Sequence, residues 1–415
     1  MIRRLFASIV VLAAMAGAAA CVDPVMPRSG TATLDDPLAG NVVAVTVGGE
    51  HTCALTSGGD AWCWGSNEFG QAGVAQGATT CARTDRNIPC EPTPRAVGGG
   101  LKFQRIAAGG THTCGIAQSG RVHCWGDNQQ GQLGDPAIST SSAPIPALTA
   151  SLYSDVVAGD AHTCALRSDG VSVCWGANDY GQLGIGSAGT GSAVPVPSQT
   201  NLRFASISVG EKRTCGRLSD GTTYCWGSHW ISRASDGTEV TRTQAQLSRV
   251  QSAPAFRQIS VGGQTTCALA LDGAAWCWEA NRSGTMGDGS TVGSTTPQLV
   301  QSLLRFSAVS AGSQSSCGIA DTGEVHCWGS NQAGQLGVPT RGVAKRCGST
   351  LSPCALSPNR VSGWRTFSTV AAGLGEHVCG ITVTGSVYCW GAGSMGQRGD
   401  GTAYSQWSPT RVPVP

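Results

Sequence analysis

The chain has 415 residues, including 59 Gly, 19 Cys and 12 Trp, and only 13% of its residues are charged. Its 40% hydrophobic content excludes a disordered chain, and 27 Lys and Arg against 25 Asp and Glu leave a net charge of +2, which gives no basic field for nucleic acid. Abundant Gly and few charges argue against a helix-rich enzyme and favour an all-β fold, either as two or three domains or as one repeat array.

The first residues have the pattern of an export signal. Arg3 and Arg4 precede an apolar run that ends at Ala20, directly before Cys21. This run is too short to prefer spanning a bilayer, and no later apolar run reaches the ~18 residues that a membrane helix needs. We therefore expect an exported chain whose mature part is soluble or held by a lipid.

The cysteine after this run indicates how the mature chain is held. A small-residue run that ends in Cys resembles a bacterial lipoprotein signal, in which the Cys becomes the lipidated first residue, although the same residues also fit ordinary signal peptidase cleavage. We predict a signal peptide over residues 1–20 and a linker from a lipid on Cys21 over residues 21–42. The protein would then lie at the outer membrane or cell surface, and it would be periplasmic or secreted if Cys21 is not lipidated.

One unit recurs seven times in the rest of the chain. In each copy two Cys stand ten residues apart, a Gly follows the first Cys by six residues, and a Trp directly follows the second Cys. The Cys pairs are Cys53/Cys63, Cys114/Cys124, Cys164/Cys174, Cys215/Cys225, Cys267/Cys277, Cys317/Cys327 and Cys379/Cys389. The tryptophans are Trp64, Trp125, Trp175, Trp226, Trp278, Trp328 and Trp390.

Each copy predicts a β-hairpin. In the third copy residues 163–166 and 171–175 alternate as short strands do, and Gly170 lies in the turn, where it can adopt a positive φ. The turn is midway between the two Cys, so they should face each other across an antiparallel pair, near disulfide reach. Because side chains alternate between faces, the Trp should point to the side of the sheet opposite the disulfide.

The repeat length indicates what the hairpins build. Successive first cysteines are 50 to 62 residues apart, which accommodates about four short strands with turns. Four short strands in about 50 residues are typical of a propeller blade. The sequence therefore predicts an all-β, seven-bladed β-propeller of four-stranded antiparallel blades, which forms one domain over residues 43–415.

The repeated residues also resemble a known family. Residues 159–166 (GDAHTCAL), 174–178 (CWGAN) and 181–184 (GQLG) are similar to the repeat of the regulator of chromosome condensation family. The resemblance covers roughly residues 43–415 and implies the blades of a seven-bladed β-propeller. It further implies a recognition scaffold, and the family's best-known activity is guanine nucleotide exchange on the nuclear GTPase Ran together with chromatin binding.

The C-terminus suggests how the ring is closed. A Pro-x-x-Val segment precedes later copies, as at Pro94 and Val97, but none precedes Cys53. The C-terminus supplies such a segment, with Pro409 and Val412. We therefore expect the last strand to complete blade 1 and to remove the open edges of the ring.

Five cysteines lie outside the hairpins, namely Cys21, Cys81, Cys90, Cys347 and Cys354. Two of them fall in an insertion at about residues 74–93 and two in an insertion at about residues 338–357, so each insertion should carry its own disulfide. The nine pairs leave Cys21 over, which lipidation would use. Zinc is not expected, because metal sites use clustered ligands and rarely recur in this way in an exported protein.

Four copies have a His two residues before the first Cys, at His51, His112, His162 and His377. A ring of bases is one interpretation of these residues. A hydrogen bond that ties neighbouring strands is the preferred one, because a catalytic group should be singular and asymmetric. No catalytic constellation or cofactor motif is found, so we predict neither enzyme activity nor a cofactor.

Departures from the repeat indicate where a partner could bind. Both insertions follow the third strand of their blade, so they should emerge on one face and flank blade 7; tolerated surface decoration is the alternative. The candidate residues are Arg83, Asp85, Arg86 and Asn87 in the first insertion and Arg341, Lys345 and Arg346 in the second. Blade 4 lacks the Gly-Gln-Leu-Gly loop, and it offers Trp230 and Arg233 as exposed anchors.

Together these features predict an exported, lipid-anchored, monomeric scaffold that binds a protein or a cell-envelope component. Membrane contact is expected only through the lipid on Cys21. Guanine nucleotide exchange, implied by the family resemblance, is one alternative, but the export signal, the paired cysteines and the lack of a basic tail conflict with it. A hydrolase or lyase that acts in the envelope and uses the central channel is another alternative.

Overall fold

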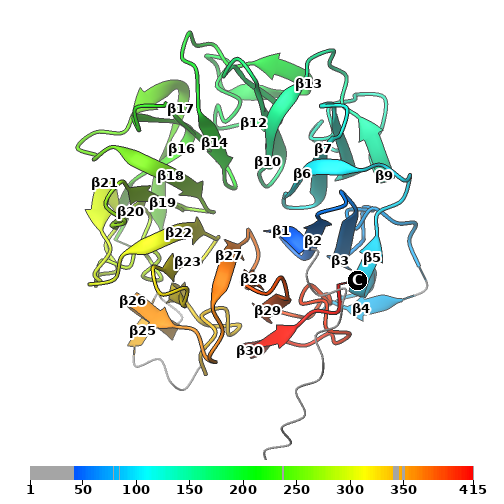
Figure 1. Cartoon of the computed structure of the whole chain (residues 1–415). Helices are drawn as coiled ribbons and strands as arrows, with labels where there is room; N and C mark the ends of the chain where they lie inside the picture. Colours follow the sequence, from blue (N-terminus) through cyan, green and yellow to red (C-terminus); the bar gives the residue numbers. More distant parts are fainter. Residues whose placement is uncertain are drawn as a thin grey trace, which may run out of the picture. The chain divides into compact units, whose positions relative to one another are not determined.

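A computed structural model of the chain describes residues 42–77, 79–83, 85–235, 238–339, 345–347 and 351–414. In this part of the chain seven antiparallel sheets stand as blades around a central axis (Figure 1). Five blades have four strands and two have five. This confirms the all-β, seven-bladed propeller, and the described residues belong to one compact unit.

Each blade is built from one continuous stretch of chain that runs from the inside of the ring outward (Figure 1). The innermost strands are β1 (Val42–Val47), β6 (Phe103–Ala108), β10 (Tyr153–Ala158), β14 (Ser206–Val209), β18 (Phe256–Val261), β22 (Phe306–Ala311) and β27 (Phe367–Ala372). The second strands are β2 (His51–Thr56), β7 (His112–Ala117), β11 (His162–Arg167), β15 (Arg213–Arg217), β19 (Thr265–Ala270), β23 (Ser315–Ala320) and β28 (His377–Thr382).

The outer half of each blade holds the third and fourth strands. The third strands are β3 (Ala61–Ser66), β8 (Val122–Asp127), β12 (Ser172–Asn178), β16 (Thr223–Arg233), β20 (Ala275–Glu279), β24 (Val325–Ser330) and β29 (Val387–Gly391). The fourth strands are β5 (Asn87–Ala96), β9 (Thr140–Pro146), β13 (Gly189–Pro197), β17 (Glu239–Arg249), β21 (Ser294–Leu299), β26 (Ser352–Arg360) and β30 (Gln406–Arg411). The insertions add β4 (Thr80–Ala82) to blade 1 and β25 (Lys345–Cys347) to blade 6.

The second and third strands form the hairpins that the sequence predicts, and every hairpin has the two Cys directly opposite each other, as for Cys164 and Cys174. The disulfides are Cys53–Cys63, Cys114–Cys124, Cys164–Cys174, Cys215–Cys225, Cys267–Cys277, Cys317–Cys327 and Cys379–Cys389, with Cys81–Cys90 and Cys347–Cys354 in the insertions. In the chain-entropy model a loop of this length contributes ~2.5–3 kcal/mol to stability.

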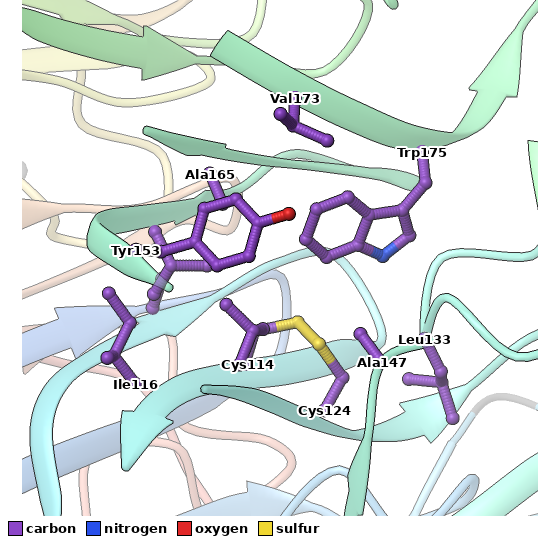
Figure 2. Packing of buried hydrophobic residues seen from close by; sticks show 12 residues of the cluster. Cys114, Ile116, Cys124, Leu133, Ala147, Tyr153, Ala165, Val173 and Trp175 are labelled. Carbon is purple, nitrogen blue, oxygen red and sulfur yellow. A yellow bond between two sulfur atoms is a disulfide. The ribbon is translucent and has the colours of Figure 1, made fainter. Parts of the chain in front are cut away.

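The core of the molecule lies between the blades rather than within one sheet. The disulfide of one blade packs against the Trp of the next, as Cys114–Cys124 does against Trp175 (Figure 2). The same pairing recurs in all seven buried clusters that join neighbouring blades. Sulfur on one face of a hairpin and indole on the other, which the alternation of the strands predicts, therefore gives each blade two complementary sides.

The predicted closure of the ring by the C-terminal strand is wrong. Strand β30 pairs with β29, so it is the outer strand of blade 7, and blade 1 has its own inner strand β1. Strands that follow one another in the chain usually lie side by side even across a longer loop, so each Pro-x-x-Val segment completes the blade that precedes it. The ring closes through side-by-side packing of blades 7 and 1, where Thr52 bonds His377 and Gly375 N donates to Gly48 O at 3.0 Å.

The antiparallel order gives the ring two distinct faces. The loops that follow the first and third strands of each blade form one face, which carries both insertions, and we call it the insertion face. The hairpin turns and the links between blades form the other, the turn face. A main-chain bond joins the two kinds of turn-face segment, as from Phe103 N to Gly59 O at 2.8 Å.

Candidate functional site

The four recurrent histidines tie neighbouring blades together. The Nε2 atoms of His51, His112, His162 and His377 lie 2.8, 2.9, 3.1 and 2.8 Å from the hydroxyl of Thr113, Thr163, Thr214 and Thr52. Each of these threonines lies in the next blade, beside the first Cys of its hairpin. The histidines thus have the hydrogen-bonding role that the sequence favours, and all four are buried.

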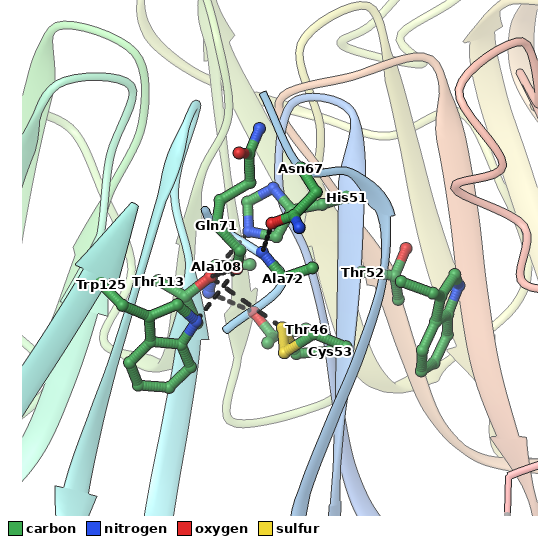
Figure 3. The surroundings of a disulfide bond; sticks show 12 residues. Thr46, His51, Thr52, Cys53, Asn67, Gln71, Ala72, Ala108, Thr113 and Trp125 are labelled. Carbon is green, nitrogen blue, oxygen red and sulfur yellow. Dashed lines mark hydrogen bonds between the residues drawn. A yellow bond between two sulfur atoms is a disulfide. The ribbon is translucent and has the colours of Figure 1, made fainter. Parts of the chain in front are cut away.

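The surrounding hydrogen bonds settle which ring nitrogen of each histidine carries the proton. The Thr113 hydroxyl donates to Gln71 O at 2.9 Å, so it is left to accept a bond from the Nε2–H of His51 (Figure 3). The same Gln71 oxygen also accepts from Trp125 Nε1 at 3.0 Å. The Gly-Gln-x-Gly loop therefore offers one carbonyl that holds both the Thr and the Trp of the following blade.

Burial keeps these histidines neutral. It lowers the pKa of His51 and His162 to about 4 and, together with the nearby histidines, the pKa of His112 and His377 to about 3. A neutral imidazole whose Nε2–H is already donated and whose ring is closed off from solvent has no access to a substrate. The ring of bases is therefore not formed.

The joint between blades 4 and 5 is built differently. Arg213 stands where other blades have His, and its guanidinium donates to Ser228 O at 2.6 Å, to Thr266 Oγ1 at 3.2 Å and to Glu279 Oε2 at 2.8 Å. Both charged side chains are buried. Burial by itself raises the pKa of Glu279, but the charge of Arg213 and the bonds from His229 and Trp230 outweigh it, so the pKa of Glu279 is lowered.

Glu279 occupies a position that glycine holds in the other six blades. The glycines there have φ between 99° and 109°, and Glu279 has a φ of 89°. A side chain in this left-handed region costs on the order of 1–3 kcal/mol and persists only where its surroundings hold it. The sequence interpretation missed this residue, although the signal was present, because Trp278 is followed by Glu where the other six copies have Gly.

In blade 4 the third and fourth strands, β16 and β17, have eleven residues each and are the longest of the described strands. Trp230, expected to be an exposed anchor, is 8% exposed. Its indole lies over Gly293 of blade 5, where a Cβ would stand 2.7 Å from the ring, and its Nε1 donates to Glu239. Arg233 also bonds Glu239, at 2.9 Å. Trp230 is therefore part of the joint, because strand alternation turns it toward blade 5.

Three cavities adjoin on the insertion face, and Glu211 lines each of them. The largest, of about 740 Å³, lies between blades 4, 5 and 6, and polar side chains such as Gln264, Gln314 and Gln332 line it. We call it the blade 4–6 cavity. A second, of about 350 Å³, lies at the mouth of the ring, and a third, of about 180 Å³, has Trp230 in its wall.

Glu211 reaches across the ring rather than toward its neighbour. It lies in the loop after β14 of blade 4, and its carboxylate accepts a hydrogen bond from Ser313 Oγ of blade 6 at 2.7 Å. The Glu211 side chain therefore passes over blade 5. This path requires glycine at position 263, where a Cβ would stand 2.4 Å from the carboxylate. The cavities therefore converge on one carboxylate in the part of the ring where the repeat is most irregular.

The first insertion folds back over the insertion face. Arg83 bonds Glu50, and both side chains line the cavity at the mouth of the ring, which we call the central cavity. Arg86 bonds Glu68. Asp85, Arg86 and Asn87 are exposed at its tip. The predicted cations thus lie on the expected face, but Arg83 and Arg86 are already paired with carboxylates of the chain itself.

The second insertion borders the blade 4–6 cavity. Cys347 and Ser352 line the blade 4–6 cavity, and Lys345 and Arg346 are exposed in β25. Arg341 and Cys21 lie outside the described residues. Both insertions therefore border cavities that meet at Glu211, which the sequence interpretation did not select.

Other kinds of site were searched for in the same part of the chain. No group of three or more His, Cys, Asp and Glu residues suited to a metal ion occurs among the described residues. Within those residues, no helix combines the length and the apolar character that a membrane span requires.

Seven repeated blades, four of which are joined to the next by a histidine–threonine bond, define a repeat-built β-propeller. The sequence matches the family described as RCC1-like domain over residues 23–316. It matches the Regulator of chromosome condensation (RCC1) repeat over residues 306–335, 322–380 and 367–397. Because the first match covers more than half of the chain, the chain belongs to the RCC1-like domain family.

Relatives with known descriptions share only part of their length with this chain. The human E3 ubiquitin-protein ligase HERC2 is 26% identical over 266 residues, which are 62% of this chain and 5% of HERC2. The Ultraviolet-B receptor UVR8 of Arabidopsis thaliana is 26% identical over 258 residues, 62% of this chain and 45% of UVR8. The chain therefore matches less than half of the length of these curated relatives.

Solved structures share the fold. Yeast RCC1 (Prp20), solved with bound Kap60, has a TM-score of 0.71 at 19% identity, with 86% of this chain and 84% of that one covered. Prp20p from Saccharomyces cerevisiae, reported with its binding properties to Gsp1p and histones, has a TM-score of 0.69 at 20% identity, with 87% of each chain covered. At these identities the likeness concerns the fold alone.

Proposed function

We propose that this protein is an exported propeller scaffold, held by a lipid on Cys21, that binds a protein partner or a cell-envelope component through its insertion face and performs no chemistry itself. The observation that carries the binding role is the convergence of three cavities on Glu211, where the repeat departs most from its own pattern. Irregular loops on a rigid scaffold are where proteins place binding sites.

The disulfides support export. Each of the seven hairpin disulfides is buried in an interface between blades, as Cys53 and Cys63 are, with no exposed surface. Such bonds form and persist in oxidising compartments and are rare in the cytosol. A thiol pair at these positions would leave the hairpins without their covalent link.

Site-specific cross-linking in intact cells tests the binding face. A photoreactive residue in place of Gln332, which is exposed and lines the blade 4–6 cavity, should give one discrete cross-linked product. The matched control replaces Gln118, an exposed glutamine in a hairpin turn of the turn face. Equal products from both positions, or a product from Gln118 alone, would contradict the proposal.

One observation favours a second candidate, a hydrolase or lyase of the envelope. Asp160 and Glu211 line the same central cavity, and burial raises the pKa of Asp160, which Lys212 partly offsets. A carboxyl with a raised pKa in a cavity is suited to general acid catalysis. Release of soluble products from isolated envelopes by the wild type but not by Asp160→Asn would support this function over a pure scaffold.

A further inference from the structure

The turn face carries an arc of exposed apolar side chains that runs from blade 5 to blade 1. Trp364 is 92% exposed and Leu303 is fully exposed, both in links between blades. Other members are Leu271 and Val383 in hairpin turns, Leu299 at the end of β21, and Val43 at the start of β1. Exposed apolar residues that gather on one face of a soluble domain mark a docking surface.

Main-chain bonds join the links to neighbouring hairpin turns within this arc. The link that contains Leu303 bonds the hairpin turn of blade 5 through Phe306 N and Gly273 O, at 2.9 Å. The next link, with Trp364, bonds the hairpin turn of blade 7 through Val383 N and Thr366 O, at 3.1 Å. Beside Leu271 and Leu299 there is a hollow of about 400 Å³ with a mostly apolar lining. Each of these links is thus tied to a hairpin turn of the same face.

The charges on the arc neutralise one another. Arg360 lies 2.7 Å from Glu324, and its guanidinium also stacks over the Trp364 ring at 5.6 Å. Arg305 lies 3.8 Å from Asp272. A surface with balanced charges, a prominent Trp and several Leu matches the composition of groups that settle at a membrane–water interface, where Trp prefers the headgroup level.

The chain enters the propeller on the same face. Val42 pairs with Thr56, the last residue before the hairpin turn of blade 1, so β1 begins at the turn face. Cys21 stands 21 positions earlier in the sequence. Twenty-one residues span at most ~75 Å when fully extended, and a tether of that length does not by itself orient the ring. A lipid on Cys21 would therefore hold the propeller near the bilayer without orienting it.

From these observations we infer that the turn face docks on a lipid bilayer surface through the arc of Leu271, Leu299, Leu303, Trp364, Val383 and Val43, so that the insertion face points away from the membrane. This inference rests on the proposed export and anchoring for its setting, and it adds a second membrane contact. The docked ring would present its cavities outward.

Vesicle binding of the Cys21→Ala protein tests the inference without any lipid anchor. The oxidised protein should co-sediment with vesicles of phosphatidylethanolamine and phosphatidylglycerol and, because the arc is charge-balanced, equally with phosphatidylcholine vesicles. Replacing Leu303 and Trp364 by Asp should lower the partition coefficient by about tenfold for each side chain. Both side chains are exposed, so the folded ring should keep its melting temperature.

A matched control lies on the opposite face. Leu351 is 66% exposed within the second insertion, and Leu351→Asp should leave vesicle binding unchanged. Trp364 also supplies a spectroscopic signal, because brominated phospholipids should quench its fluorescence, and Trp364→Phe should remove the quenched component. No vesicle binding by the Cys21→Ala protein, or a dimer in sedimentation that the Leu303 and Trp364 replacements dissolve, would overturn the inference.

The lipid anchor is tested separately by the mass of the wild-type N-terminus from purified membranes. An unacylated N-terminus with intact vesicle binding would remove the anchor and leave the docking surface. An acylated N-terminus without vesicle binding by the Cys21→Ala protein would leave the anchor and remove the docking surface.

Discussion

The joint between blades 2 and 3 and the joint between blades 4 and 5 hold the same threonine position with different groups. In the first, His112 donates to Thr163, and Gln132 O accepts from that hydroxyl. In the second, blade 4 has no Gly-Gln-Leu-Gly loop, and Arg213 donates to Thr266. One joint is neutral throughout, and the other buries an ion pair.

The difference follows from the missing loop. Where a loop carbonyl takes the threonine proton, a neutral histidine completes the set of bonds. Without that carbonyl, Arg213 is the donor to Thr266, and Glu279 balances its charge from a position with a φ of 89°. Burying two charges carries a desolvation cost, and the backbone strain adds to it. The irregular joint is thus held by strong but costly interactions, and it stands beside the largest cavity.

Acid should separate the two kinds of joint most clearly. The folded-state pKa values of the four histidines are about 3 to 4, below the ordinary histidine value of 6.5, so below pH 6.5 the unfolded chain binds protons that the folded chain does not. Their contribution is complete above pH 6.5 and is lost as pH falls toward 4. Between pH 6.5 and 5 the four histidines together should lower the free energy of unfolding by about 6 kcal/mol in urea titrations. The raised pKa values of Asp155, Asp160 and Glu376 should offset part of this loss.

Two controls belong to this measurement. His112→Gln keeps an amide donor but does not titrate, so it should remove about a quarter of the pH dependence. Glu279 has a lowered pKa, so its contribution begins to be lost only near and below the ordinary glutamate value of 4.5, outside this window. A free energy of unfolding that is flat between pH 6.5 and 5 would show that the histidines are not buried as described.

Removal of one charge from the irregular joint should have the next largest effect. Glu279→Gln leaves Arg213 buried without a counter-charge, and it should lower the free energy of unfolding by about 3–5 kcal/mol. The control is Glu324→Gln, because the Glu324–Arg360 pair is partly exposed, and it should cost less than about 1 kcal/mol. Equal losses for the two variants would mean that the ion pair does not hold the joint.

The last strand and Trp230 show where sequence reasoning stops. The hairpin disulfides followed from a ten-residue spacing around a turn, because local register is encoded by neighbours. The blade to which residues 406–411 belong could not be predicted in this way, because a repeated strand pattern does not tell which blade a strand completes. The short turn between residues 42–47 and 51–56, which already gives blade 1 an inner strand, was the better signal. Trp230 was placed wrongly because its environment depends on blade 5, which no local pattern describes.

The cavities were beyond the sequence for the same reason. Glu211 joins three cavities through a contact with Ser313, which is 102 residues away and two blades further on. Strand order alone predicted the face on which the insertions lie. It did not predict the hydrogen-bond partners of Arg83 and Arg86, because these are carboxylates in other loops of the same ring.

Restoring the regular residues should convert the irregular joint. The double variant Arg213→His with Glu279→Gly removes both charges and relieves the positive φ, which costs about 1–3 kcal/mol in the wild type. Its free energy of unfolding should lie within about 2 kcal/mol of the wild type, although Glu279→Gln alone loses more. A double-mutant cycle checks this coupling, and additive losses would refute it.

The smallest effect is expected at a single regular joint. Thr163→Val leaves the Nε2–H of His112 buried without an acceptor, and this should lower the free energy of unfolding by about 1–3 kcal/mol. Thr163→Ser keeps the hydroxyl that links His112 to Gln132 O, so it should lose only the packing of one methyl group, about 1 kcal/mol or less. Equal free energies of unfolding for the Val and Ser variants in urea titrations at pH 7 would contradict this prediction. The packing of disulfide against indole would then hold the regular joints, and the histidine side chains would contribute only packing between the blades.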